Sequence, residues 1–443
     1  MISASTSFGP GPLRARQSWA CLVFAWAALA SAASQAQQGL TLDQALRVAQ
    51  QRSLQLAAQD SAASASREMS ISAGQRPDPT LKLGINNLPV NGPDRLSLSR
   101  DFMTMRSVGV MQELTRSDKL KARSARFDRE AEAAAAARAQ VLVNLRRDTA
   151  LAWLDRHYQE QMLMLLRSQR AETNLQTEAA DAAYRGGRGA QADVFSARSA
   201  VAAIDDRIRQ TDRQLAVAST RLARWVGSQA DQPLGAVPAL EAVRIDPATT
   251  DWLTHHPEIA MLRKQEEMAG ADADIARSNQ RPDWTVGSKM VSRRGPAFSN
   301  MVSVNVSIPW QLDPKRRQDR DLAAKLAVVE QLRAQREEAT REHLAETQGW
   351  LHEWRSGRDR MAHHDSTLIP LAAERTRAAM AAYRGGGGSL AGVLEARRME
   401  IDIRMDRLRL EMDAAGWWAR LQYLLPPDHA AAAPALTRLA TEK

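Results

Sequence analysis

Cysteine is nearly absent from this sequence of 443 residues, since Cys21 is the only one. It lies within the first 36 residues, which carry the features of an export signal. Without that segment the chain has no cysteine, which excludes disulfide bonds, thiolate metal ligands and a cysteine nucleophile. The stability of the chain must therefore come from packing and assembly.

The first 36 residues are predicted to be a signal peptide. Arg14 and Arg16 precede a mostly apolar run at 20–33, and small residues offer cleavage sites after Ala32 or after Ala36. The segment predicts export from the cytoplasm. Its removal takes away two arginines and no acidic residue, so the formal net charge falls from +9 to +7.

Aromatic residues and long apolar runs are also scarce. Phe, Trp and Tyr make up only 5% of the chain, which disfavours a compact enzyme with a large aromatic core. Beyond the signal segment, no stretch approaches the roughly 20 apolar residues that a transmembrane helix needs. What is abundant is Ala, Arg, Leu, Gln and Glu, a mixture typical of extended helices and coiled coils. Lys and Arg are interspersed with Asp and Glu, so the positive net charge does not indicate nucleic-acid binding.

The two halves of the chain carry the same order of motifs, which indicates a tandem duplication. Gln-Arg-Pro-Asp occurs at 75–78 and 280–283, and Tyr-Arg-Gly-Gly occurs at 184–187 and 383–386. The predicted segments are a signal peptide at 1–36, a first repeat at 37–227, a linker at 228–250, a second repeat at 251–426 and a tail at 427–443. The first repeat contains a hairpin at 80–114 and long helices at 118–183 and 190–227. The second contains a hairpin at 284–310 and long helices at 313–383 and 389–425.

The predicted long helices carry a narrow apolar stripe. From Val201 to Trp225 apolar residues recur at alternating spacings of three and four, and the stretch from Ile401 to Ala419 repeats this pattern. Such a stripe packs against a neighbouring helix, as in a coiled coil. At about 1.5 Å per residue, the helices at 118–183 and 313–383 would each be roughly 100 Å long.

Four segments alternate apolar and polar residues, as strands with two different faces do. They are 80–87 with its partner 106–114, and 300–308 with its partner 284–292. One reading is two small hairpins that cap a helical bundle. The other is an outer-membrane barrel, in which a row of apolar residues faces lipid. That row consists of Leu81, Leu83, Ile85, Val302, Val304 and Val306.

Four strands cannot close a barrel on their own. Open edges would leave backbone N–H and C=O groups unpaired in hydrocarbon, at a cost of several kcal/mol each. Membrane insertion would therefore require that two or three copies of the chain pool their strands. The long helices would then form a tube joined to the barrel, which is the shape of a conduit.

The ordered set of motifs resembles the TolC family of outer-membrane efflux proteins over nearly the whole chain, from Leu40 to Pro426. Each motif is short, and the resemblance depends on the same motifs occurring in the same order, at similar spacing, in both halves of the chain. The motifs are the two-fold repeat, the alternating segment from Val302 to Ile308 ending at Pro309, the glycine turns at 184–190 and 383–389, Asp193-Val194 after the first turn, and residues 393–396 after the second.

The resemblance implies a mainly α fold with a small β part. Three protomers would form one α-helical tunnel and one shared twelve-stranded barrel in the outer membrane of a Gram-negative bacterium, with a large periplasmic portion. The partners implied are a periplasmic membrane-fusion adaptor, an inner-membrane pump and outer-membrane lipid, with no nucleic acid. Residues 86–114 are similar to the branch associated with heavy-metal efflux of the resistance-nodulation-division type.

The resemblance also assigns roles to the two glycine turns and to the residues after them. The turns would be tips on which the adaptor docks, although glycine also ends helices without any such role. Tyr383 and Asp193 match a hydrogen-bonded latch at the periplasmic entrance, and Glu395 matches one carboxylate of an acidic ring. Gly392 and Gly388 depart from this pattern, since a second acid and a basic latch residue are expected there. The docking residues are Gly186, Gly187, Gly189, Ala190, Gly386, Gly387, Gly388 and Ser389.

No metal site or cofactor is predicted. The pairs His255-His256 and His363-His364 are adjacent in sequence, so their side chains point about 100° apart on a helix. Met103 and Met105 share one strand face and suit soft ions, but such a pair also faces lipid or fills gaps in a core. Asp193 and Glu395 can equally be ordinary carboxylates on a helix surface.

The sequence therefore predicts a trimeric outer-membrane channel that catalyses no reaction and exports heavy-metal cations. Export of drugs or other organic solutes, or a role as the exit duct of type I secretion, are the alternatives within the channel class. A soluble periplasmic coiled-coil adaptor or scaffold is the alternative from another class, and it would not require the strands to alternate.

Overall fold

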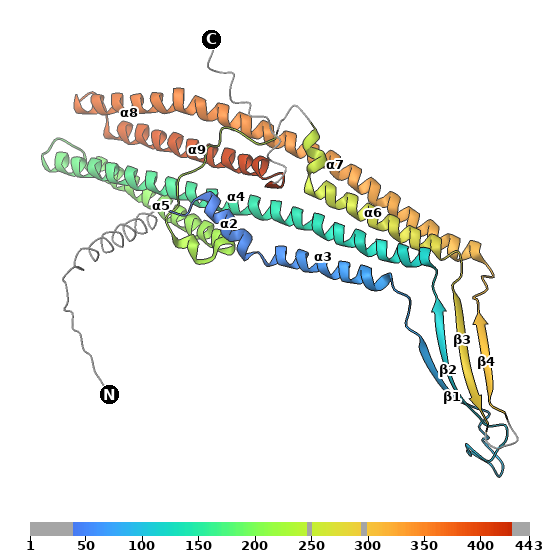
Figure 1. Ribbon diagram of the computed structural model, residues 1–443. Coiled ribbons are helices and arrows are strands. Elements are labelled where there is room, and N and C mark those ends of the chain that lie inside the picture. The colour runs from blue at the N-terminus through green and yellow to red at the C-terminus, as the bar shows by residue number, and fades with distance from the viewer. Residues whose placement is uncertain (1–38, 246–249, 294–298, 428–443) are drawn as a thin grey trace, which may run out of the picture.

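The computed structural model describes residues 39–245, 250–293 and 299–427, and it consists of a long helical body with a four-stranded sheet at one end (Figure 1). The predicted signal peptide at 1–36 lies outside the described residues, as do residues 246–249 of the predicted linker and all but the first residue of the predicted tail. Within the described part of the chain, no helix is both long and apolar enough to cross a membrane.

The described residues of the first half form four α-helices, which are α2 (Leu42–Arg52), α3 (Leu54–Ala73), α4 (Ser117–Arg185) and α5 (Gln191–Val226). Thr41 and Gln44 form a reciprocal capping box that begins α2. Ser53 ends α2, and its hydroxyl accepts a hydrogen bond from the Leu56 N–H at 3.3 Å, so it also begins α3. α4 has 69 residues and spans roughly 100 Å, as its sequence predicts.

The second half forms α6 (Pro257–Ser278), α7 (Gln318–His363), α8 (Ile369–Arg384) and α9 (Leu390–Gln422). Short 3₁₀ turns at Gly227–Asp231 (η1) and Asp251–His255 (η2) lie in and beside the predicted linker. In each half a helical segment precedes a two-stranded hairpin and long helices follow it, but two α-helices precede the first hairpin and one precedes the second.

One helix prediction is wrong in detail, because the segment 313–383 is not a single α-helix. It begins with a 3₁₀ turn at Pro314–Arg316 (η3), and a π-helical turn at His364–Leu368 (η4) separates α7 from α8. Pro370 is the second residue after this turn. Proline has no N–H to donate to the preceding turn and its ring crowds the carbonyl four residues earlier, so the helix widens there. Beyond the break, α8 continues from α7 toward the end of the body that lies far from the sheet (Figure 1).

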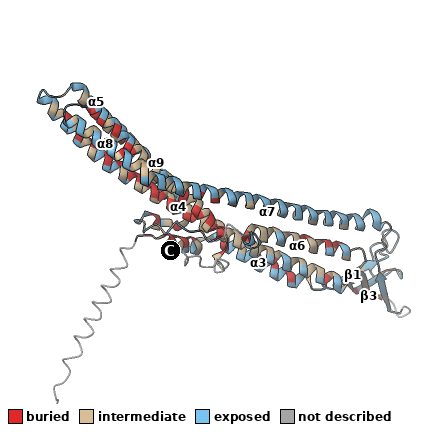
Figure 2. Ribbon diagram, turned by 90° about the horizontal axis from the view of Figure 1, so that it is seen from above, coloured by how far each residue is buried: buried red, intermediate tan, exposed pale blue. Residues whose placement is uncertain are grey.

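The main core lies in the middle of the helical body, where α2, α4, α5, α7 and α9 meet. Trp153 and Tyr158 of α4 are fully buried there, and the indole N–H of Trp153 donates to the Leu40 carbonyl at 2.9 Å. The predicted apolar stripes of α5 and α9 supply buried contacts, including Leu222 and Ala415. Figure 2 shows buried residues concentrated in this region, whereas α7 is exposed along most of its length.

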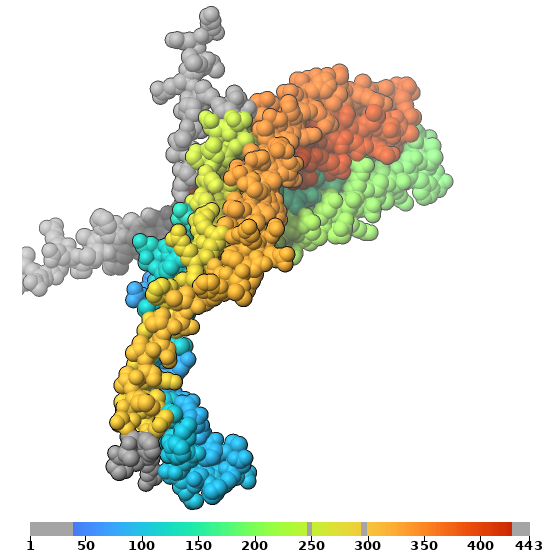
Figure 3. Space-filling model, turned by 90° about the vertical axis from the view of Figure 1, so that its right-hand side faces the viewer, coloured from blue at the N-terminus to red at the C-terminus, as the bar shows by residue number. Residues whose placement is uncertain are grey.

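The sheet contains β1 (Thr80–Asn86), β2 (Met105–Leu114), β3 (Trp284–Ser292) and β4 (Met301–Ser307), all antiparallel and in the order β1-β2-β3-β4. The four strands lie where the alternation of the sequence predicts them. The two hairpins are joined along β2 and β3, which pair from Arg106 opposite Ser292 to Leu114 opposite Trp284. Figure 3 shows the hairpins side by side in a thin sheet that projects from the helical body.

A cluster of polar contacts ties the sheet to the helices. Asp283 is the last residue of the second Gln-Arg-Pro-Asp motif and directly precedes β3. Its carboxylate accepts hydrogen bonds from the Lys119 ammonium at 2.6 Å and from the Arg116 backbone N–H at 3.1 Å. Because Lys119 and Asp283 are both largely buried, this ion pair joins the start of α4 to the start of β3. The sequence motif marks the position but does not reveal its partner.

Candidate functional site

The sheet sorts its side chains by chemistry onto two faces. Cross-strand pairing places Leu81, Val110 and Val304 in one row on the same face, together with Ser288 of β3. The predicted outward residues all lie on this face and all are exposed, with Val304 at 68% of its full accessible area. Their exposure is Leu81 63%, Leu83 72%, Ile85 51%, Val302 71% and Val306 58%.

The opposite face of the sheet is polar and closely packed. Lys82 and Lys289 flank Gly109 in the same cross-strand row. A Cβ atom on Gly109 would lie 2.6 Å from the Lys289 Cβ, so this position accommodates only glycine. Ser303 and Asn305 of β4 also point to this side, because they alternate with the exposed valines.

The two outer edges of the sheet are open within the described chain. β1 pairs only with β2, and β4 pairs only with β3, so each outer strand has one unpaired side. Exposed edges of this kind are sites for pairing with another strand. Both edges belong to strands whose apolar face is exposed, so a partner strand would extend that face.

Large apolar and basic side chains surround the base of the sheet, where it joins the helices. Trp284 begins β3 and is 53% exposed, and Trp310 and Leu312 follow β4 and are 85% and 87% exposed. Lys315 and Arg317 are exposed on the next turn. This band therefore combines tryptophan with positive charge at one end of the apolar face.

The glycine turns form two tips at the end of the body opposite the sheet (Figure 1). Gly187 joins α4 to α5 with φ of 68°, and Gly386 joins α8 to α9 with φ of 77°. These left-handed values favour glycine, which has no Cβ. Gly189 and Gly388 are closely approached by the preceding helix turn, so the two tips are built alike. The predicted docking residues all lie on these tips.

The two tips begin their second helix with different caps. Ser389 accepts a hydrogen bond from the Gly392 N–H at 3.2 Å. Ala190 has no side chain that can do this, and the Asp193 carboxylate instead accepts from the Ala190 N–H at 3.4 Å. Asp193 therefore stabilises the start of α5, whichever other role it has.

The three predicted gate residues lie near the tips but do not contact one another as a latch within one chain. Tyr383 packs against a small apolar cluster that includes Val194 and Val393. No hydrogen bond joins Tyr383 to Asp193 among the described residues. Glu395 lines an open groove of about 660 Å³ between α5 and α9, where the exposed ring of Phe195 lies opposite it. The described chain by itself therefore does not form the predicted latch.

The structure brings together two histidines that the sequence analysis did not connect. His256 begins α6 and His343 lies on α7, and their ring centroids are 4.1 Å apart. The Glu258 carboxylate lies 3.0 Å from His343 Nε2. Within the described residues, no group of three His, Cys, Asp or Glu side chains can hold a metal ion. The pair lies 87 positions apart in sequence, so spacing along a single helix could not find it.

His256 is held in its neutral form. It is only 4% exposed and packs against Trp252 as well as His343. Burial, with a smaller effect of the neighbouring His343, lowers the pKa of His256 from 6.5 to about 3.

Acid should therefore destabilise the helical body through His256. The pKa in the folded chain lies below that in the unfolded chain, so as pH falls from about 6.5 toward 3 the unfolded chain binds the proton first. We expect this group to remove about 1.4 kcal/mol of unfolding free energy per pH unit in that range. His256→Gln should flatten the pH dependence in equilibrium unfolding, whereas His352→Gln, at an exposed position, should leave it unchanged. An unaltered slope in His256→Gln would contradict the assignment.

The sequence matches no protein-family model and no curated protein, whereas the structure matches several solved channels. The chain superposes on CusC with a TM-score of 0.75, 17% identity, and coverage of 86% of this chain and 91% of the other. It superposes on VceC of Vibrio cholerae with a TM-score of 0.71, 16% identity, and coverage of 86% and 95%. It superposes on MtrE of Neisseria gonorrhoeae, in its open state, with a TM-score of 0.67, 16% identity, and coverage of 87% of this chain and 88% of the other.

The described chain thus has the fold of outer-membrane channel proteins. CusC is a protein that folds and forms a transmembrane channel, VceC is an outer-membrane protein, and MtrE is an outer-membrane channel. The mainly α fold with a small β part, implied by the resemblance to the TolC family, is confirmed. The matches are channel proteins rather than enzymes.

Proposed function

We propose that this chain is one protomer of an outer-membrane efflux channel. The observation that carries the proposal is the sheet, in which one face is apolar and exposed, the other is polar, and both outer edges are open. A surface of this kind is costly in water and fits a lipid environment. The helical body extends from its base far enough to reach across a periplasmic space.

Three copies would convert the open sheet into a closed barrel. β1 of one protomer would pair with β4 of the next, so that three sets of four strands form a twelve-stranded barrel with no free edge. The polar face with Lys82 and Lys289 would line the interior. The exposed length of α7 would pack against the adjacent protomer, which is consistent with its few buried residues.

The band at the base of the sheet supports this orientation. Tryptophan is enriched at membrane interfaces, where its ring is apolar and its N–H reaches polar groups. Trp284 and Trp310 would lie at the periplasmic boundary of the outer membrane, and Lys315 and Arg317 would face lipid headgroups. The glycine tips would then point into the periplasm, where we propose that a membrane-fusion adaptor and an inner-membrane pump dock.

Tyr383 and Asp193 are proposed to form a latch between neighbouring protomers or helix pairs, with Glu395 in an acidic ring at the entrance. Tyr383→Phe removes only the hydroxyl, so it should raise the single-channel conductance in planar bilayers while leaving trimer yield unchanged. Tyr184→Phe alters the equivalent tyrosine of the first tip and is the matched control. Equal conductance for Tyr383→Phe and the unmodified channel would argue against the latch.

We further propose that the exported substrates are heavy-metal cations. The chain is 16–17% identical to CusC, VceC and MtrE alike, so the structural comparisons do not favour one class of substrate. The metal assignment therefore rests on the similarity of residues 86–114 to the heavy-metal branch. A ring of Glu395 carboxylates would attract cations. A deletion strain should lose resistance to one or more of copper, silver, zinc, cobalt and cadmium. Sensitivity to organic toxicants alone would overturn the metal assignment and favour drug efflux.

A further inference from the structure

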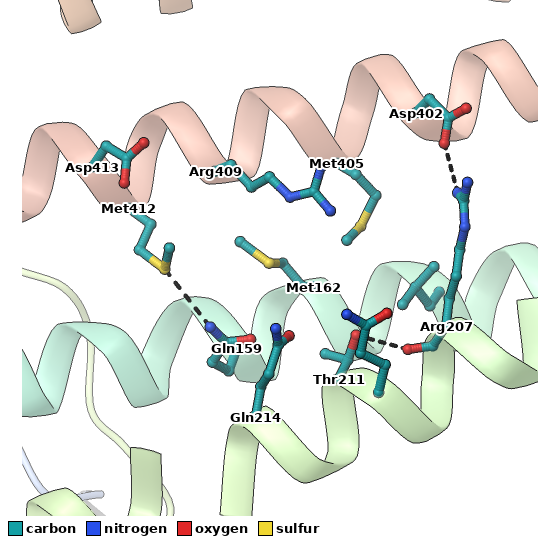
Figure 4. Close-up of a pocket in the computed structure, with 12 residues that line it drawn as sticks. Gln159, Met162, Arg207, Thr211, Gln214, Asp402, Met405, Arg409, Met412 and Asp413 are labelled. Atoms are coloured by element: carbon teal, nitrogen blue, oxygen red, sulfur yellow. Dashed lines mark hydrogen bonds and ion pairs between the residues drawn. The ribbon is translucent and has the colours of Figure 1, made fainter. Parts of the chain in front are cut away.

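A cavity of about 400 Å³ lies inside the helical body, away from the tips and the sheet, where α4, α5 and α9 meet (Figure 4). It is lined by Gln159, Met162, Arg207, Met405, Met412 and Asp413, among others. None of the roles proposed above uses this cavity. The volume exceeds that of several water molecules, so the surrounding side chains leave real space in an otherwise packed region.

Three thioether groups point into the cavity. Met162 projects from α4, whereas Met405 and Met412 project from α9 and lie seven residues apart, on the same side of that helix (Figure 4). Met162 and Met405 are 4% and 6% exposed, so their sulfur atoms are shielded from solvent. Methionine has three rotatable side-chain bonds, which allow these sulfur atoms to converge on one ion.

Gln159 adds an oxygen to the same space. Its side chain is 8% exposed, and its amide N–H donates to the Met412 sulfur at 3.8 Å and to the Asp155 carboxylate at 3.3 Å. Its carbonyl oxygen Oε1 is buried and has no hydrogen-bond partner among the described residues. A buried acceptor without a partner costs about 1–3 kcal/mol, so apolar packing alone does not explain this residue.

The charged side chains that line the cavity balance one another. Arg207 is paired with Asp402 at 2.6 Å, and Arg409 is paired with Asp406 at 3.0 Å, so both arginines are neutralised. Asp413 lines the cavity and forms no ion pair within the described chain. Arg207 and Arg409 thus balance the two carboxylates of the lining, Asp402 and Asp413, and the donor atoms themselves are neutral, which suits an ion of low charge.

We propose that this cavity binds a soft monovalent cation through the sulfur atoms of Met162, Met405 and Met412 and through Oε1 of Gln159. Thioethers are soft ligands that select soft ions such as Ag(I) and Cu(I) over hard ions such as Mg(II) and Ca(II). A singly charged ion suits neutral donors with one nearby carboxylate. The site does not require that the chain be a channel, because all of its residues belong to one protomer.

The test is a calorimetric titration of Ag(I) into the purified full chain, in detergent and in chloride-free buffer. All variants carry Cys21→Ser so that no thiol competes. We expect one site that is lost when Met162, Met405 and Met412 are all replaced by leucine, and each single replacement should weaken binding roughly tenfold or more. Leucine nearly preserves volume, so the helical circular dichroism should remain. At saturation, X-ray absorption should show sulfur neighbours around silver.

Two further variants distinguish the site from general methionine binding. Met164 lies on α4 two residues from Met162 but is 54% exposed, so Met164→Leu should bind Ag(I) like the unmodified chain. Gln159→Met adds a fourth thioether and should tighten binding, a gain that misfolding cannot produce. The proposal is overturned if the folded triple variant keeps the site, if Met164→Leu weakens binding equally, or if Gln159→Met fails to tighten it.

Discussion

Val304→Arg should prevent assembly of the proposed channel. Val304 is the central residue of β4, is 68% exposed, and lies in the apolar row of the sheet. An arginine facing lipid at the bilayer midplane costs roughly 2–4 kcal/mol, and three copies in one barrel would cost roughly three times as much. We expect the yield of trimers in the outer-membrane fraction to fall to background, as measured by membrane fractionation and by size-exclusion chromatography in detergent.

The adjacent residue provides the control for this experiment. Asn305 follows Val304 in the same strand, but its side chain points to the polar face, opposite Gly287. Asn305→Arg introduces the same charge at the same depth and should assemble with nearly normal yield. If Val304→Arg and Asn305→Arg assemble equally well, the apolar face does not contact lipid, and a water-soluble coiled-coil scaffold becomes the better explanation.

Trp153→Ala should unfold the middle of the helical body. The Trp153 side chain is fully buried in the main core, stacks on His157 with ring centroids 5.6 Å apart, and donates to the Leu40 carbonyl. Truncation of a buried tryptophan costs about 3–5 kcal/mol. The Leu40 carbonyl would lose one of its two hydrogen bonds and keep the one from the Gly235 N–H at 3.0 Å. We expect a loss of that size in the free energy of unfolding, which is measured from the helical circular dichroism signal during unfolding.

Two variants separate the contributions to this loss. Trp153→Phe keeps most of the ring but removes the N–H, and the Leu40 carbonyl stays bonded to the Gly235 N–H, so it should lose about 0.5–1.5 kcal/mol. Trp310→Ala removes a tryptophan that is 85% exposed at the base of the sheet, and it should leave the unfolding of the helical body unchanged. A loss below 1 kcal/mol for Trp153→Ala would show that the core does not depend on this residue.

Local patterns in the sequence predict most of the elements. The alternation at 80–87 and 300–308 predicts β1 and β4 within one residue, because the side-chain period of a strand depends only on its own residues. The stripe from Val201 to Trp225 predicts the buried face of α5 for the same reason. The break between α7 and α8 was not predicted, although Pro370 was visible in the sequence.

Some of the candidate sites could be predicted from the sequence, and others could not. The glycine tips could be predicted, because Gly187 and Gly386 recur in the same short motif and require a left-handed backbone. The His256–His343 pair and the methionine cavity could not, since their members come from helices far apart along the chain. Met162, Met405 and Met412 each match an apolar stripe, so the sequence alone describes them as core residues.

By itself, the sequence predicted the four strands, the tight glycine turns and the apolar stripes of the long helices, because these properties depend on neighbours within a few residues. Only the tertiary structure decided that β2 pairs with β3, so that both hairpins present their apolar residues on one face. It also decided which buried polar atoms lack partners. Register between strands and convergence between helices depend on contacts across hundreds of residues, and no local period encodes them.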